Sequence, residues 1–102
     1  MTIEFGDWQL RKRDENNWEL YHRHETRATK LSVENGTVGQ MRWHGTGHFY
    51  QERTFANALE YAADWEMRNK VEATADFKGY AAMLGDTLER FRTDFARSIQ
   101  AN

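Results

Sequence analysis

The sequence contains no cysteine and no proline among its 102 residues. Without cysteine the chain has neither a disulfide framework nor a thiolate metal site. A small domain without disulfides suits the reducing cytosol, so we expect a cytoplasmic location. Without proline, chain reversals must depend on asparagine and on the seven glycines.

The sequence also has little net charge and no long hydrophobic run. Its formal charge is −2, which argues against a general polyanion binder and against an acidic mimic of DNA. No segment approaches the roughly 18 apolar residues of a membrane helix, so we expect no membrane partner. The opening residues, MTIEFGDWQ, do not have the basic and apolar regions of a signal peptide.

Aromatic residues are plentiful, at 14% of the chain. Large rings bury much surface per residue, so a small core built from them can be adequate. The length fits one domain with one modest core, and we expect a single domain over residues 1–102.

The first half is predicted to form an antiparallel meander of three or four strands. Alternate residues of a strand face the same side of a sheet, so alternating apolar residues identify each strand. One predicted face carries Trp18, Leu20, His22 and His24. The expected strands cover residues of about 2–13, 17–25, 28–34 and 37–44.

Glycine and asparagine residues help to define the first and third of these strands. Apolar alternation changes phase at Gly6, which predicts a bulge inside one continuous strand. In the third strand, Leu31 and Val33 are expected to point inward. Asn35-Gly36 then predicts a hairpin turn.

The second half is predicted to form two helices, at about 54–69 and 75–99. Residues 44–50, HGTGHFY, are expected to connect sheet and helices. The predicted fold class is therefore α+β, with both helices packed on one face of the meander. The apolar stripe of the last helix is Phe77, Ala81, Leu84, Leu88, Phe91, Phe95 and Ile99.

The last helix is longer than a small sheet can cover, at roughly 36 Å. Its C-terminal end should then carry apolar surface that needs another partner. A symmetric dimer buries the same patch twice. We therefore expect a homodimer whose interface contains Phe91, Phe95 and Ile99.

The stretch YHRHE, residues 21–25, places His22 and His24 on the same side of a strand. Two such histidines can share a metal if His44 or His48 completes the site. No full ligand set with a recognisable spacing is present, so we expect partly buried, hydrogen-bonded imidazoles, with no metal and no cofactor.

Basic residues share the outer face of the predicted sheet with an aromatic ring. This combination is typical of platforms that bind single-stranded nucleic acid, but the carboxylates of Asp7, Asp14, Glu19 and Glu25 lie close by. Trp, Tyr and Arg also dominate protein-binding hot spots. The candidate partner-binding residues are Arg11, Arg13, Tyr21, Arg23 and Tyr50.

No nucleophile with an adjacent base and no phosphate-binding loop can be identified. We expect a protein that is not an enzyme and has no catalytic residues. A small metal-dependent enzyme centred on His22 and His24 stays open as an alternative.

Four motifs together carry a resemblance. They are WxL at 8–10, NNWxL at 16–20, NGT at 35–37 and FYxxxxFxxALxYA at 49–62. This order resembles small tailed-phage and prophage proteins of a domain-of-unknown-function family. The resemblance implies a phage or mobile-element accessory protein, acting in the host cytoplasm by binding a host protein complex. It implies, by analogy, a counter-defence inhibitor of the anti-CRISPR kind. A nucleic-acid-binding regulator that uses the basic sheet face is the alternative.

Overall fold

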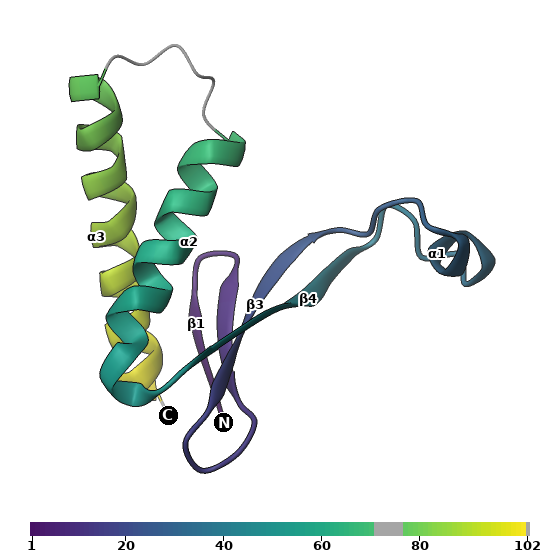
Figure 1. The fold of residues 1–102 in the computed structure, drawn as a ribbon, viewed down its shortest axis with the longest axis horizontal. Coiled ribbons are helices and arrows are strands. Elements are labelled where there is room, and N and C mark those ends of the chain that lie inside the picture. Colours follow the sequence, from purple (N-terminus) through teal and green to yellow (C-terminus); the bar gives the residue numbers. More distant parts are fainter. Residues whose placement is uncertain (71–76, 102) are drawn as a thin grey trace.

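The structure, a computed structural model, describes residues 1–70 and 77–101. Four antiparallel strands form one sheet in the order β1-β2-β3-β4, and two long helices follow (Figure 1). The α+β meander with two helices on one face is confirmed. The elements are β1 (Thr2–Phe5), β2 (Trp8–Lys12), β3 (Trp18–Glu25), α1 (Lys30–Glu34), β4 (Met41–Tyr50), a 3₁₀ turn (Glu52–Thr54), α2 (Phe55–Lys70) and α3 (Phe77–Ala101).

The predicted continuous strand over 2–13 is wrong, because its two halves form the hairpin β1–β2. Gly6 has a φ of 59° and begins the two-residue loop, and glycine at that position is favoured in tight hairpins. Antiparallel pairing sets Phe5 opposite Trp8. A hairpin therefore puts both apolar pairs on one face, as the bulge was expected to do.

The predicted third strand at 28–34 is also wrong, because residues Lys30–Glu34 form the short helix α1. Thr29 caps this helix and accepts a hydrogen bond from the Ser32 amide, while the Ser32 hydroxyl accepts one from the Thr29 amide. This reciprocal pair is a capping box, which favours a helix over an extended segment. Asn35 ends the helix, and Gly36 follows with a φ of 66°.

Strand β4 begins later and runs further than the predicted 37–44. The segment 44–50, expected to be a connector, belongs to this strand and pairs with β3. Beyond the body, the ends of β3 and β4 and the helix α1 form a projection that we call the arm, residues 24–42 (Figure 1).

The two helices lie close to their predicted bounds, although positions 75 and 76 fall outside the described residues. Helix α2 packs small side chains against the sheet, and α3 lies along β1. The buried cluster consists of Ile3, Phe5, Trp8, Leu10, Trp18, Leu20, Ala58, Leu59, Ala62, Ala63 and Phe91.

The residues predicted for a dimer interface lie mainly within this core. Phe91 is only 4% exposed, and its ring meets Phe5 edge-on at 5.3 Å between centroids. Phe95 packs against Phe5 and Phe55. Strand β1 covers the Phe91 ring, so that ring is not available to a second copy, whereas Phe95 is only partly buried. Ile99 alone of the three is about half exposed, at 48%.

Candidate functional surfaces

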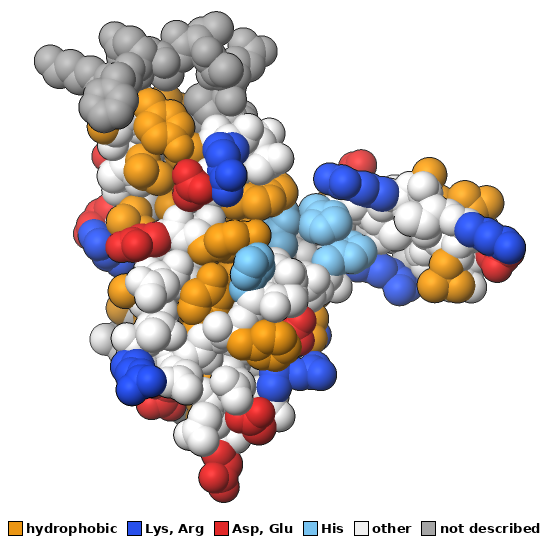
Figure 2. All heavy atoms as spheres, viewed as in Figure 1, with side chains coloured by type: hydrophobic (Ala, Val, Ile, Leu, Met, Phe, Trp, Pro, Cys, Tyr) orange, Lys and Arg blue, Asp and Glu red, His pale blue; other side chains and the backbone are white. Residues whose placement is uncertain are grey.

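Three imidazoles stack where the arm leaves the body (Figure 2). His22 packs between Trp8 and Trp65, with ring centroids 4.2 and 4.3 Å away. His24 lies nearly parallel to His44 at 4.0 Å, with an interplanar angle of 14°. These rings border a shallow pocket of about 330 Å³ that Arg27, Thr46 and Tyr61 also line.

The surroundings of His44 favour the neutral form of its imidazole. Burial lowers the pKa of His44, and the neighbouring charges of His24 and Arg42 lower it further. A hydrogen bond with the His24 backbone opposes this shift. The His44 Nε2 atom is buried and has no hydrogen-bond partner among the described residues.

The geometry of the histidines is that of a stack. Among residues 1–70 and 77–101, no group of three or more His, Cys, Asp or Glu side chains is placed to hold a metal ion. The nearly parallel pair, His24 and His44, meets face to face, whereas a histidine binds zinc through a nitrogen in the plane of its ring. His48 lies apart from the stack and packs against Tyr61 at 4.5 Å.

The outer face of the sheet carries arginines stacked on aromatic rings. The Arg11 guanidinium lies 4.0 Å from the centre of the Tyr21 ring. Arg23 lies 5.3 Å from the Trp43 ring. Arg13 donates a hydrogen bond of 3.2 Å to the Tyr21 hydroxyl. The structure therefore brings four of the five predicted partner-binding residues together.

Carboxylates on the same face hold these side chains in place. Asp7 accepts a 2.9 Å hydrogen bond from Arg23 within an ion pair. Glu19 lies 3.6 Å from Arg13 and accepts a hydrogen bond from the Tyr21 hydroxyl. These ion pairs and hydrogen bonds restrain the side chains of the Arg–aromatic pairs within the chain itself.

Tyr50, the fifth predicted partner-binding residue, lies on the other side of the sheet. It pairs with Trp18 across β3 and β4 and packs against the core. Burial raises the pKa of its hydroxyl. The prediction for Tyr50 is therefore wrong. The side of the sheet that Tyr50 faces depends on the register of β4 against β3, and a segment expected to be a connector has no such register.

Trp43 and Phe49 belong to the outer face, and the sequence prediction missed them. Gly45 lies between them in β4, and a Cβ there would lie 2.5 Å from the Glu19 carboxylate and 3.4 Å from the Tyr21 ring. The glycine therefore makes room for neighbouring side chains. The sequence did contain a signal for this placement. Trp43, Gly45 and Phe49 are separated by even numbers of positions, as residues on one face of a strand are.

The end of the arm exposes apolar side chains. Leu31 and Val33 are 67% and 64% exposed, contrary to the prediction that they point inward. Val38 and Met41 are 47% and 57% exposed. We call these four residues the arm tip, which Figure 2 shows as separate apolar patches on the projection.

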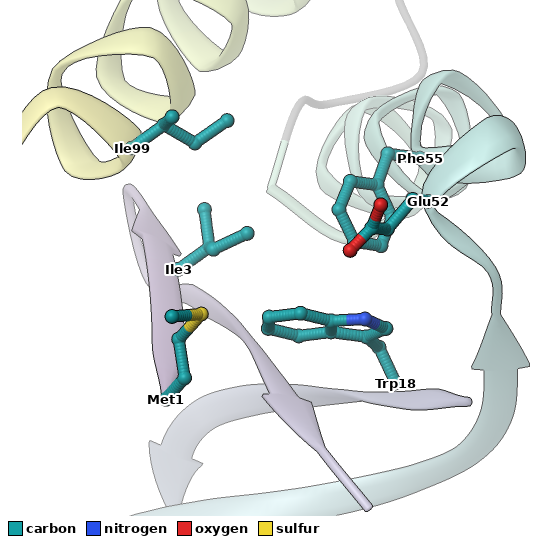
Figure 3. A pocket seen from close by; sticks show the side chains of 6 residues that line it. All are labelled: Met1, Ile3, Trp18, Glu52, Phe55 and Ile99. Atoms are coloured by element: carbon teal, nitrogen blue, oxygen red, sulfur yellow. The ribbon is translucent and has the colours of Figure 1, made fainter. Parts of the chain in front are cut away.

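An apolar pocket of about 410 Å³ opens beside the N-terminus. Its walls come from Met1 and from residues of β1, β3, the 3₁₀ turn, the beginning of α2 and the end of α3. Figure 3 shows five apolar side chains around it, with the Glu52 carboxylate facing the same space. We call it the terminal pocket, lined by Met1, Ile3, Trp18, Glu52, Phe55 and Ile99.

No helix within the described ranges has a stretch long and apolar enough to cross a membrane. No family model matches this chain, and neither a curated protein nor a solved structure shows a significant match to it.

Proposed function

We propose that this chain acts by binding another protein through the outer face of its sheet. We define this outer face as Arg11, Arg13, Tyr21, Arg23, Trp43 and Phe49. The observation that carries the proposal is the pair of Arg–aromatic stacks, Arg11 on Tyr21 and Arg23 on Trp43, on the side away from the helices.

This composition is that of a protein-binding hot spot, in which Trp, Tyr and Arg contribute most of the binding energy. Phe49 adds an apolar ring that is 54% exposed. Ordering long side chains on binding costs about 0.5–1.5 kcal/mol each. Side chains already stacked and ion-paired avoid part of that cost.

A nucleic-acid platform is the second candidate, because arginines and rings on a sheet can also stack on bases. Two features favour a protein. Arg13 and Arg23 are already paired with Glu19 and Asp7, and phosphate contacts would have to replace those pairs. The net charge of −2 gives no general attraction for a polyanion.

The resemblance to small phage proteins identifies a host protein complex as the first partner to test. A counter-defence inhibitor, acting on a CRISPR effector or another host nuclease, is the narrower form of the proposal. It rests on analogy with proteins of similar length and motif order.

The test is a quantitative affinity capture from host lysate, with and without nuclease. The bait variant combines Arg11→Ala with Arg23→Ala, and the matched control is Arg92→Ala, an exposed arginine on α3. We expect a nuclease-resistant partner that wild type and the control retain and the double variant loses at least roughly tenfold. Equal capture by all three baits would refute the outer face as the binding surface. Recovery that disappears with nuclease would favour nucleic acid.

A further inference from the structure

The arm tip and the terminal pocket are two apolar surfaces of one chain that lie apart. Figure 1 shows the arm projecting away from the two chain ends, beside which the pocket opens. None of residues 24–42 belongs to the described hydrophobic core. The arm tip is therefore an apolar surface that its own body does not cover.

The arm is ordered so as to hold this surface in one position. The amide of Thr26 donates a 2.9 Å hydrogen bond to the Gln40 carbonyl, and the amide of Gly39 donates one of 3.0 Å to Thr26. The Ser32 hydroxyl donates a 2.6 Å hydrogen bond to the Arg27 carbonyl. A chain segment with this many internal bonds can present Leu31 and Val33 without first folding on a partner.

The terminal pocket has matching chemistry. Five of its six lining side chains are apolar, and the sixth is the carboxylate of Glu52. In the arm, Lys30 directly precedes Leu31, whose side chain is 67% exposed. A segment that inserts an aliphatic side chain beside a lysine thus fits a pocket that combines apolar walls with one carboxylate.

We propose that the arm tip docks in the terminal pocket of a second copy, and that two copies exchange arms reciprocally. The arm points away from its own pocket, so a second molecule must supply the contact. A two-fold axis would make each contact twice and leave no arm or pocket free. Because the exchange is reciprocal, the apolar surface that one contact covers is covered twice in the dimer.

This inference goes beyond the proposed function and does not depend on it, because it uses no residue of the outer face. It keeps the expected homodimer but replaces its predicted interface at Phe91 and Phe95. Of the three predicted residues, only Ile99 takes part.

The first experiment measures the dimer dissociation constant by sedimentation for three variants. Leu31→Asp places a charge in the arm tip, and Ile99→Asp places one at the pocket. Met83→Asp is the matched control, because Met83 is 40% exposed on α3 and lines neither surface. We expect the first two to weaken the dimer by roughly thirtyfold or more and the control to leave it unchanged.

Mixing Leu31→Asp with Ile99→Asp distinguishes arm exchange from other dimers. The first variant keeps an intact pocket and the second an intact arm, so the mixture regains one of the two contacts. We expect a heterodimer stronger than either variant alone. Each mutated side chain is exposed, and circular dichroism checks that the fold is kept.

The absence of cysteine allows a direct geometric test. Lys30→Cys and Glu52→Cys each introduce a single thiol, and a mixture of the two should form a disulfide-linked heterodimer on oxidation. Glu89→Cys replaces Glu52→Cys as the control and should form none. A monomeric wild type, a dimer unaffected by both aspartates, or no preferential 30–52 cross-link would overturn the proposal.

Discussion

At the residue scale, the histidines show how a pattern and its chemistry can separate. The alternation in YHRHE placed His22 and His24 on the core face; His22 is buried there, and His24 is partly buried. The approach of His44 could not be predicted, because it depends on the register between β3 and β4. That register brings His44 nearly parallel to His24, and His22, beside them, packs against Trp8 and Trp65.

The stack should make stability depend on pH. Because burial lowers the pKa of His44 below its usual 6.5, the unfolded chain binds a proton more readily than the folded one. The free energy of unfolding should therefore rise with pH between the lowered pKa and about 6.5. The stability that neutral His44 contributes is fully present above about pH 6.5 and is fully lost below the lowered pKa.

His44→Gln removes this titration and should flatten the curve over the same window. Urea unfolding between about pH 5 and about pH 8 measures it, with His48→Gln as the control outside the stack. The neighbouring groups that face the stack include His22, Arg27 and Arg42. If the free energy of unfolding changes with pH equally in His44→Gln and in wild type below about pH 6.5, the interpretation fails.

At the scale of elements, the arm contains one feature that a local sequence signal indicates, the helix α1, and one that depends on tertiary contacts, the length of β4. The segment 28–34 was predicted to be a strand from its apolar alternation, yet it forms the helix α1. The Thr29-Ser32 capping box is a local signal and could have been recognised in the sequence. The length of β4 could not be predicted from local signals, because two glycines interrupt the strand. The reason for a glycine at position 45 is the closeness of the Glu19 and Tyr21 side chains, which only the tertiary structure reveals.

Thr29→Ala should open α1 without unfolding the protein. A lost helix cap costs about 1 kcal/mol, which corresponds to roughly fivefold faster local opening. Amide hydrogen exchange should accelerate by that factor at Val33 and Asn35, whose amides bond to the carbonyls of Thr29 and Leu31. Amides of β2 should not change. Thr93→Ala, which removes an exposed hydroxyl from α3, is the control and should leave the arm amides unaffected.

At the scale of the whole molecule, α3 and the β1–β2 hairpin hold the two halves of the chain together. Gly6 lies against Phe91, and a Cβ there would lie 2.9 Å from the ring.

If the chain dimerises by arm exchange, two outer faces would belong to one assembly. Two linked binding surfaces increase overall affinity for a partner that can engage both.

Gly6→Ala should destabilise the protein more than Gly36→Ala. Both glycines have a left-handed φ, at 59° and 66°, which costs an alanine about 1–2 kcal/mol. Gly36 has nothing within 4 Å of the added carbon, whereas Gly6 adds the clash with Phe91. The difference in unfolding free energy should be about 1–3 kcal/mol. Equal losses, measured in urea, would show that α3 shifts to make room.

The sequence alone was enough to predict the α+β class, the core face of β1, β2 and β3, and the extent of α2. These features follow from the period of the apolar residues, which is a local property of the chain. Tertiary structure decided which residues meet across strands, how deeply Phe91 and Phe95 are buried, and which apolar side chains stay exposed on the arm. Those outcomes depend on register and on the packing of α3 against β1, because contacts between distant residues leave no periodic signal in either segment.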